Sequence, residues 1–380
     1  MKTRVAICRC GSYEHEEVEH AVRRLMSLIG ADALLPESGA VLVKPNMLGP
    51  EAPERAVTTH PEVIFAVSKY VSERCEAVEI GDSPGRGAYP VVCEVTGIGN
   101  AASRSGASIV SFEEEIPTKH PSGRICKEFP LAKPVVSSSA LVNVAKMKTH
   151  GLMTFTGAVK NLYGCVSGAR KAHLHFRYQE PSDFGLMISD LLELVNPRIS
   201  ILDAVVGMDG EGPSHGRPRN IGLLMASPDP VALDVVAMHV AMADPMTVPY
   251  LKSCRKYGVG ETRLENMDIL GQRLQDVQMQ DFLMPARTGS SLLTFRWAGP
   301  LRRELSPIPL VDADLCRLCG QCVASCPPKA MSLMNYGVTI QRKACIKCYC
   351  CQELCPFGAI TLKKKPLARL AEAVADLIRR

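Results

Sequence analysis

The sequence contains no long run of hydrophobic residues. None of its stretches approaches the ~18 uninterrupted apolar residues that suggest a membrane span. At the N-terminus, the apolar residues that precede Arg9 are too few for a secretory signal. We therefore expect a cytoplasmic protein without a membrane span.

Charge of either sign is in little excess. The 44 basic and 39 acidic residues give a net charge of +5, and residues 361–380 alone hold six basic and two acidic residues. The rest of the chain is therefore nearly neutral and lacks the broad positive field that nucleic-acid binding usually needs. The sequence also has no P-loop and no strand-linked Gly-x-Gly-x-x-Gly, so it does not support a Rossmann NAD site.

Cysteine, by contrast, is abundant. Nine of the 16 cysteines fall within residues 312–356. A secreted disulfide framework would be short and would carry a signal peptide, and this chain has neither feature. The cysteine-rich segment is therefore expected to bind metal.

One cysteine spacing occurs twice in this segment. The pattern Cys-x-x-Cys-x-x-Cys-x-x-x-Cys-Pro begins at Cys316 and again at Cys345. It is the signature of bacterial two-cluster ferredoxins, in which three close cysteines hold one 4Fe–4S cluster and the fourth reaches the other cluster. Zinc also accepts thiolates, but zinc modules mostly use two separated Cys-x-x-Cys pairs. The predicted ligands are Cys316, Cys319, Cys322 and Cys355 for one 4Fe–4S cluster, and Cys345, Cys348, Cys351 and Cys326 for the second.

The same region resembles a bacterial-type ferredoxin over about fifty residues, with all eight ligand positions matched. The resemblance implies one-electron transfer to or from a redox partner protein. We expect a small ferredoxin-like α+β module at residues 312–362, preceded by a connector over 286–311 and followed by an amphipathic helix over 363–380. Cys350 is surplus to the pattern and is either a packed small hydrophobe or a redox-sensitive spare.

Residues 1–285 alternate strand-like and helical patterns. This alternation predicts an α/β domain with a mostly parallel sheet and flanking helices. Apolar strand-like runs occupy residues 5–8, 40–43, 77–80, 108–111, 140–144, 199–206 and 221–225. Helices are predicted from Val18 to Ile29 with Gly30 as the stop, from Pro61, from Ser182, and from Asp229-Pro230 to Val240.

Five of the predicted strands end in polar residues. Ligands bind at the carboxyl ends of strands in parallel α/β sheets, so we expect these five tips to share one edge and to form a pocket. The candidate substrate-binding residues are Lys44, Asn46, Asp82, Ser83, Asn143, Lys146, Lys160, Asn161, Asp203, Glu211 and Asp234, and the candidate catalytic residues are Lys148 and His150.

The lysines of this set have two interpretations. They could bind an anionic molecule such as a carboxylate, a phosphate or a polyanionic cofactor. They could instead form an internal salt-bridge network, because an unpaired buried ammonium group is costly. The carboxylates that could compensate them are Asp82, Asp203, Glu211, Asp229 and Asp234. His150 could act as a general acid or base, or make a structural hydrogen bond.

Several motifs of residues 1–240 resemble a family catalogued as domain of unknown function 362. Members of that family often carry a C-terminal double-cluster ferredoxin module, and the resemblance supports one shared site without naming a substrate. The motifs are Lys44-Pro-Asn, Gly81-Asp-Ser-Pro, Asn143-Val-Ala-Lys-Met-Lys-Thr-His, Gly157-Ala-Val-Lys-Asn-Leu-Tyr-Gly, Asp203-Ala-Val-Val-Gly-Met-Asp-Gly-Glu-Gly-Pro and Asp229-Pro-Val-Ala-Leu-Asp.

Three hypotheses for the function follow. In the first, the protein is an iron–sulfur oxidoreductase that passes electrons to an anionic substrate or cofactor in the α/β domain. In the second, it is a non-catalytic electron-transfer or binding protein that serves a partner enzyme. In the third, it is a maturation factor for clusters or cofactors. The sequence leaves open whether an organic cofactor, such as a flavin or a corrinoid, also binds.

Overall fold

The computed structural model describes residues 2–168, 170–285 and 306–363, which form two compact units. One unit comprises Met1–Lys171 and Glu180–Met284, and the other comprises Ala172–Gln179 and Pro285–Arg380. Most of the expected connector and nearly all of the expected C-terminal helix lie outside the described residues.

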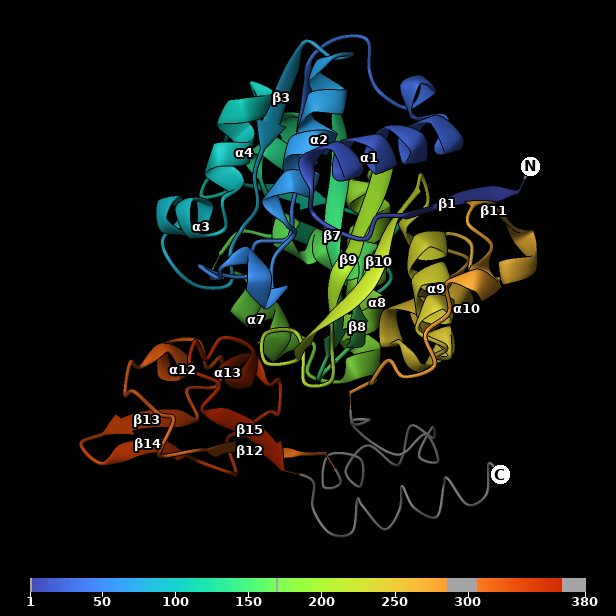
Figure 1. Ribbon diagram of the computed structural model, residues 1–380. Helices are drawn as coiled ribbons and strands as arrows, with labels where there is room; N and C mark the ends of the chain where they lie inside the picture. Colours follow the sequence, from blue (N-terminus) through green and yellow to red (C-terminus); the bar gives the residue numbers. More distant parts are fainter. Residues whose placement is uncertain (1, 169, 286–305, 364–380) are drawn as a thin grey trace, which may run out of the picture. The chain divides into compact units, whose positions relative to one another are not determined.

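The first unit is built around a nine-stranded sheet (Figure 1). The strand order is β11-β1-β10-β9-β7-β2-β3-β4, and β8 pairs with β7. The strands are β1 (Thr3–Arg9), β2 (Ala40–Lys44), β3 (Ala77–Ile80), β4 (Ser108–Ile109), β7 (Ala140–His150), β8 (Thr154–Thr156), β9 (Ile199–Asp209), β10 (Arg217–Ser227) and β11 (Met267–Gly271). A separate antiparallel pair, β5 (Glu115–Lys119) and β6 (Glu128–Ala132), lies outside this sheet.

Most neighbouring strands of the sheet run parallel, as predicted. Only β10, which pairs antiparallel with both β1 and β9, and the short β8 depart from this arrangement among the described strands. The direction of β10 corrects one expectation. Ser227, at its carboxyl end, pairs with Ser200, at the start of β9. The polar tip around Asp229 therefore lies at the opposite edge from the tips of β2, β3, β7 and β9.

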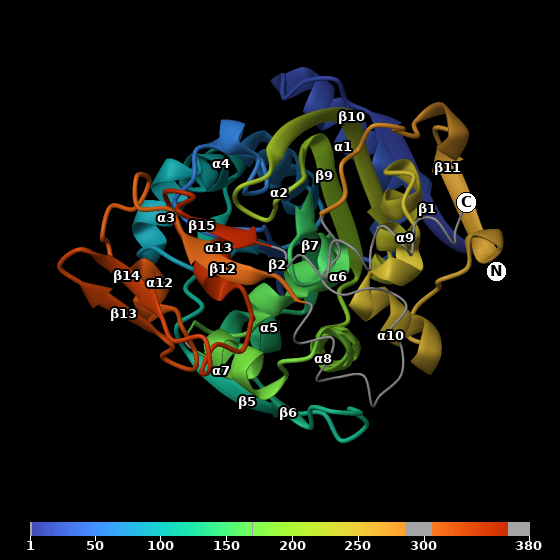
Figure 2. The ribbon, with the colours of Figure 1, turned by 90° about the horizontal axis from the view of Figure 1, so that it is seen from below.

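Helices cover both faces of the sheet (Figure 2). On one face α1, α2 and α4 pack together, and on the other α8 packs on α10 and α9 packs on α6. The helices of this unit are α1 (His15–Ile29), α2 (Pro61–Ser72), α3 (Tyr89–Val95), α4 (Ile98–Ser105), α5 (Lys133–Ser137), α6 (Ala158–Asn161), α8 (Pro181–Val195), α9 (Pro230–Val240) and α10 (Pro249–Tyr257). A further helix, α7 (Arg170–Arg177), spans the division between the two units.

Local signals in the sequence place the helix ends well. Gly30 adopts the left-handed conformation that ends α1, and Pro61 begins α2. The side chain of Asp229 accepts hydrogen bonds from the N–H groups of Val231 and Ala232, which caps α9. The predictions for these three helices are confirmed, and α8 begins one residue before the expected Ser182.

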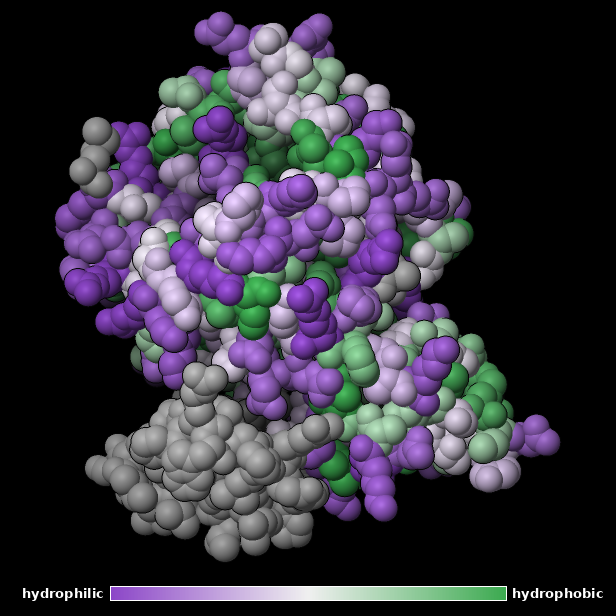
Figure 3. All heavy atoms as spheres, turned by 180° about the vertical axis from the view of Figure 1, so that it is seen from behind, coloured by the Kyte–Doolittle hydropathy of each residue, from purple (hydrophilic) through white to green (hydrophobic). Residues whose placement is uncertain are grey.

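Alternate strand residues form the core beneath α1, α2 and α4. Val41 and Val43 of β2 and Val142 and Val144 of β7 belong to this buried cluster. The period of two places the remaining strand residues on the other face. On the side shown in Figure 3, hydrophilic side chains cover much of the surface and hydrophobic ones reach it in small groups between them.

The second unit contains two antiparallel strand pairs and two short helices of residues 306–363. β12 (Ile308–Val311) pairs with β15 (Ile360–Lys363), and β13 (Met331–Met334) pairs with β14 (Gly337–Ile340). The helices are α12 (Gln321–Ala324) and α13 (Cys350–Glu353). β12 lies in the segment that the sequence assigned to the connector, and its pairing joins it to the cysteine-rich module.

None of the helices in the described parts of the chain combines the length and the apolar character that crossing a bilayer requires.

Candidate functional site: an iron–sulfur module and a polar sheet edge

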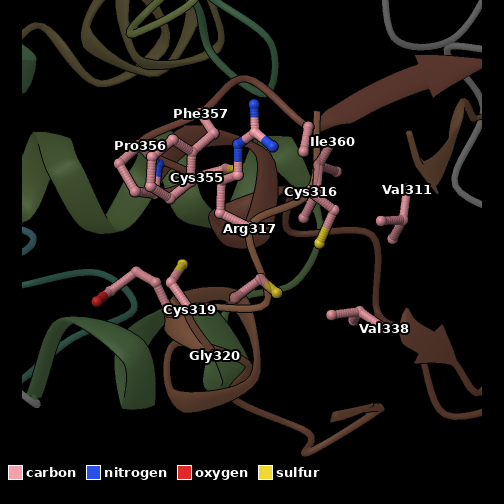
Figure 4. A pocket seen from close by; sticks show the side chains of 13 residues that line it. Val311, Cys316, Arg317, Cys319, Gly320, Val338, Cys355, Pro356, Phe357 and Ile360 are labelled. Carbon is pink, nitrogen blue, oxygen red and sulfur yellow. The ribbon is translucent and has the colours of Figure 1, made fainter. Parts of the chain in front are cut away.

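The cysteine-rich module contains a cavity that four cysteines line. Figure 4 shows Cys316, Cys319 and Cys355 around this cavity, with Cys322 as the fourth. Three of them come from the first repeat, whereas Cys355 ends the second. This set is the first of the two predicted quartets.

A second cavity has the reciprocal lining. Cys345, Cys348 and Cys351 come from the second repeat, and Cys326 comes from the end of the first. The chain therefore crosses between the two cavities at both Cys-Pro turns. Apolar side chains surround the sulfur atoms, including Val311, Val338 and Ile360 at the first cavity; the same side chains pack in the module's small core.

The two repeats also share an unusual backbone. In the first loop Leu318 and Gly320 adopt positive φ angles of 52° and 74°, and at the matching positions Lys347 and Tyr349 adopt 56° and 62°. The left-handed conformation costs free energy for residues other than glycine. Its recurrence at matching positions of both repeats therefore indicates that the loops require it. Alternation of left- and right-handed residues turns successive N–H groups toward one side, where they form an anion-binding concavity. The loops suit an anionic cluster held by thiolates.

Sulfur spacing separates a cubane from a zinc ion. Four thiolates around zinc, with Zn–S bonds of about 2.3 Å, lie about 3.8 Å apart. Among the residues that the structure describes, no three cysteine sulfurs lie within 4.8 Å of one another. The described cysteine sulfurs are therefore not gathered as closely as a tetrahedral zinc site requires.

At the edge of the α/β sheet, the first buried lysine forms an ion pair. Lys44, at the end of β2, is fully buried, and its Nζ lies 2.8 Å from Oδ1 of Asp82 after β3. Asp82 also accepts hydrogen bonds from the N–H groups of Met47 and Ser83. A Cβ on Gly164 would lie 2.1 Å from Asp82 Oδ1 and 2.6 Å from Lys44 Nζ, so this position requires glycine.

This close approach gives a first prediction. Gly164→Ala should destabilise the α/β domain by about 1–3 kcal/mol, because the new methyl group must displace one partner of a buried ion pair. Urea denaturation followed by far-UV circular dichroism measures the change. Gly106→Ala is the control, since its added Cβ has open space, although its positive φ also gives a smaller cost. Equal losses in both variants would contradict the packing argument.

A second buried lysine pairs across neighbouring strands. Lys146 of β7 stands opposite Asp203 of β9 in register, and its Nζ lies 2.9 Å from Asp203 Oδ2. The Tyr13 hydroxyl donates a hydrogen bond to Asp203 Oδ1 at 2.9 Å, and the backbone N–H of His60 donates one to Oδ2 at 3.0 Å. The rings of Tyr13 and His60 stack with centroids 3.5 Å apart. Burial lowers the pKa of Lys146, although Asp203 opposes that shift, and burial lowers the pKa of His60 to about 4.

A third lysine contacts neutral oxygens. Lys148 Nζ donates to Asn46 Oδ1 at 2.8 Å and to the Val57 carbonyl at 2.6 Å. The amide of Asn46 donates to Asn161, whose own amide donates to Asn143 Oδ1 at 2.8 Å. The register of β7 against β9 shifts between Lys146 and Lys148, which is the kind of irregularity that re-aims a side chain. Lys148 and the three asparagines thus form one continuous hydrogen-bonded chain.

The remaining predicted residues differ in their surroundings. His150 is buried, and its Nδ1 accepts from the N–H groups of Leu152 and Met153. Ser83 accepts from the N–H of Gly168, and Lys160 lies over the ring of Tyr163. Glu211 is exposed.

Asp234 has a structural role in this fold. Its carboxylate accepts from the N–H groups of Ala158 and Val159 at the start of α6, and from the Tyr250 hydroxyl at 3.1 Å. A Cβ on Gly157 would lie 2.1 Å from Asp234 Oδ1, so the contact is tight. Burial raises the pKa of Asp234 to about 7.

This raised pKa predicts a pH dependence. Between about pH 4 and pH 7 the unfolded carboxyl group has lost its proton while the folded one keeps it, so the unfolded state binds fewer protons. The free energy of unfolding should therefore fall as pH rises through this window, by up to about 1.4 kcal/mol per pH unit. Denaturation curves of Asp234→Asn and the unmodified protein at several pH values isolate this contribution. A difference that stays constant with pH would contradict it.

Two members of the site, Tyr13 and His60, are not among the residues predicted from the sequence. β1 runs antiparallel to β10, which runs antiparallel to β9, so β1 ends at the same edge as β9. Tyr13 follows that strand end by a few residues. The polar segment Gly11-Ser12-Tyr13 follows a predicted strand, and this position could have identified Tyr13 as a candidate. His60 could have been identified because it precedes Pro61, which begins a helix.

Both the α/β domain and the cysteine-rich module match known protein families. Residues 41–239 match the family described as "Domain of unknown function (DUF362)", and residues 308–356 match a 4Fe-4S dicluster domain. A thylakoid-associated protein of Synechocystis sp. is 34% identical over 269 residues, which cover 69% of this chain and 81% of that protein.

The lactate racemase apoprotein of Thermoanaerobacterium thermosaccharolyticum shows a weak structural similarity, with 14% identity and a TM-score of 0.38. The matched region covers 68% of this chain and 58% of that one, and the TM-score is too low to assign a shared activity. The family match covers more than half of this chain, and the Synechocystis protein is similar over most of its length. The chain therefore belongs to the DUF362 family and carries a C-terminal 4Fe–4S dicluster domain.

Proposed function

We propose that this protein is an iron–sulfur redox protein that passes single electrons through two 4Fe–4S clusters to or from an anionic molecule bound in the α/β domain. The observation that carries the proposal is the reciprocal lining of the two cavities by four cysteines each. Each cluster, when bound, supplies a one-electron carrier. Two carriers in one short module suit a relay between a redox partner protein and an acceptor.

The proposed ligands follow the cavities. Cys316, Cys319, Cys322 and Cys355 would hold one cluster, and Cys345, Cys348, Cys351 and Cys326 would hold the other. Cys350 is buried with Ile346 and Cys348 in a small apolar cluster, which supports its interpretation as a packed small side chain.

The anionic molecule would bind at the polar edge of the sheet. The charges of Lys44 and Lys146 are balanced by Asp82 and Asp203, so these pairs would shape the site rather than hold an anion. Lys148, which donates to Asn46 Oδ1 and to the Val57 carbonyl, and Lys160 would contribute positive charge to the site. Asn46, Asn143 and Asn161 would orient the bound molecule through the amide chain that links them.

His150 is the proposed hydrogen-bond donor to the reduced molecule. Because its Nδ1 accepts two backbone hydrogen bonds, the neutral imidazole carries its proton on Nε2. Electrons added to an anionic substrate raise its negative charge, and this Nε2–H group would stabilise that charge by donating a hydrogen bond. The cytoplasmic location stays a prediction from the sequence.

Lys148→Met tests the anion site. Protein purified without oxygen should release an anionic small molecule, detected by mass spectrometry, and the variant should retain at least tenfold less of it because a buried ammonium group has been lost. Lys133→Met is the control, since the Lys133 side chain is 53% exposed. Both variants should keep the visible absorbance of the clusters.

Two outcomes would reject parts of this proposal. Equal retention of the molecule by Lys148→Met and by the unmodified protein would exclude Lys148 from the site. If the unmodified protein releases no such molecule, and after reduction only passes electrons to a partner, the non-catalytic electron carrier replaces the enzyme hypothesis.

A further inference from the structure

A second group of metal-ligating side chains lies in the α/β domain, apart from the cysteines. One ring nitrogen of His120 and one carboxylate oxygen from each of Asp190 and Glu193 lie within 4.8 Å of one another. Asp190 and Glu193 stand three residues apart on α8 and so share a face of that helix. His120 follows β5 in the turn that leads to β6. Two elements distant in sequence thus bring three potential ligands together.

His120 is buried in an unusual state. It is 6% exposed, and its Nε2 has no hydrogen-bond partner among the residues that the structure describes. A buried polar atom without a partner costs free energy and calls for an explanation. Gly123 packs against the ring, since a Cβ there would lie 2.6 Å from His120 Cδ2. The turn therefore holds the imidazole in place beside the carboxylates.

The two carboxylates, Asp190 and Glu193, differ in burial and in the number of hydrogen bonds that they accept. Asp190 is fully buried and accepts from the backbone N–H groups of Arg124, Ile125 and Cys126, at 2.8 to 2.9 Å. Three of these four bonds reach Oδ2, whereas Oδ1 accepts one of them and a long bond from the Arg124 guanidinium at 3.5 Å, which a metal ion would replace. Glu193 is exposed at the surface and offers an entry path for an ion.

The Arg124 guanidinium neutralises part of the negative charge of Asp190 and Glu193. Its guanidinium pairs with Glu193 and lies 3.5 Å from Asp190 Oδ1, and it also lies over the ring of Tyr257 at 5.0 Å. Two carboxylates outnumber one guanidinium, so the group keeps an excess of negative charge. The Tyr257 ring gives the guanidinium a favourable position after it releases Glu193.

We propose that His120, Asp190 and Glu193 bind one divalent transition-metal ion, with zinc as the best fit, in competition with the Arg124 guanidinium. Imidazole nitrogen and carboxylate oxygen together suit zinc and its neighbours better than magnesium or calcium, which prefer oxygen alone. Three protein ligands leave a fourth position for water. Binding would give the buried imidazole a partner and would tie the β5–β6 turn to α8.

Zinc binding to the full-length protein with intact clusters tests this proposal. Equilibrium dialysis against Zn²⁺ without oxygen, with metal analysis of the protein, should show one zinc per chain beyond the iron. Glu193→Gln and His120→Gln should each weaken binding by at least about tenfold, because loss of a ligand costs no less than loss of its supporting shell. Asp183→Asn, on the exposed surface of the same helix, should leave binding unchanged.

Arg124→Ala provides a test in the opposite direction. Removal of the competing positive charge should strengthen zinc binding by about fivefold or more. Constant visible absorbance during the titration shows that zinc has not displaced iron from the clusters. Absence of zinc in the unmodified protein, or equal binding by Glu193→Gln, His120→Gln and the unmodified protein, would overturn the site. Neither result bears on the electron-transfer proposal, because that proposal depends on the cysteine cavities.

Discussion

Replacement of Cys355 by alanine should halve the iron content of the protein, from about eight atoms per chain to about four. Cys355 lines the cavity of the first cysteine repeat although it ends the second repeat. Its loss would leave three thiolates for that cluster, whereas the other cavity would keep its four cysteines. Iron and sulfide analysis, together with electron paramagnetic resonance of the reduced protein, measures the loss.

Paired substitutions test the crossing of the chain directly. If the cavities report the ligands correctly, Cys316→Ala with Cys355→Ala removes one cluster, because both residues line the same cavity. Cys316→Ala with Cys326→Ala should remove both clusters. If each repeat instead held its own cluster, the results of these two double variants would be exchanged.

Cys350→Ser is the matched control, because Cys350 adjoins the ligand Cys351 but lines neither cavity. It should retain about eight iron atoms. A loss of iron in this variant equal to that in Cys355→Ala would show that general damage to the module, rather than ligand removal, explains the effect.

The cysteine module could be predicted from sequence because its information is local. The spacing between Cys316 and Cys326 repeats between Cys345 and Cys355, and a cluster of fixed size dictates that spacing. What the sequence could not show was the backbone. Tyr349 adopts the left-handed conformation that Gly320 adopts at the matching position, and nothing in its residue type predicts this.

The mostly parallel sheet of the α/β domain was predicted correctly, but the direction of β10 was not. Apolar runs mark strands, but strand direction depends on how the connection is made. Only seven residues, 210–216, separate β9 from β10, whereas a parallel crossover needs about a dozen or more. The short, glycine-rich connection between Asp209 and Arg217 was therefore evidence for a hairpin, and it moves the tip at Asp229 to the opposite edge.

The partners of the buried lysines in the candidate site could not be predicted from the sequence either. Burial of Lys44 and Lys146 demands compensation, which the sequence could establish, but the choice of partner depends on strand order and register. Lys146 meets Asp203 because β7 and β9 are neighbours in register. Tyr13 joins this pair from a loop 190 residues away from Asp203, and no local pattern links the two.

Asp203→Asn should destabilise the α/β domain by about 3–5 kcal/mol, the range for breaking a buried ion pair. The variant leaves the Lys146 ammonium group without its charged partner and weakens the acceptor for the Tyr13 hydroxyl and the His60 N–H. Urea denaturation followed by far-UV circular dichroism measures the free energy of unfolding. Visible absorbance follows the cluster module separately, because a chain of two units need not unfold in one step.

Asp32→Asn is the matched control, because it removes the same charge from an ion pair at the surface. Asp32 pairs with Arg74, but its side chain is 71% exposed, so the loss should stay below about 1 kcal/mol. Replacement of both buried partners, in Lys146→Met with Asp203→Leu, should recover much of the stability, because no uncompensated charge remains. A small loss in Asp203→Asn, equal to that in Asp32→Asn, would mean that water reaches the pair, and the buried network at the sheet edge would then be open to a ligand.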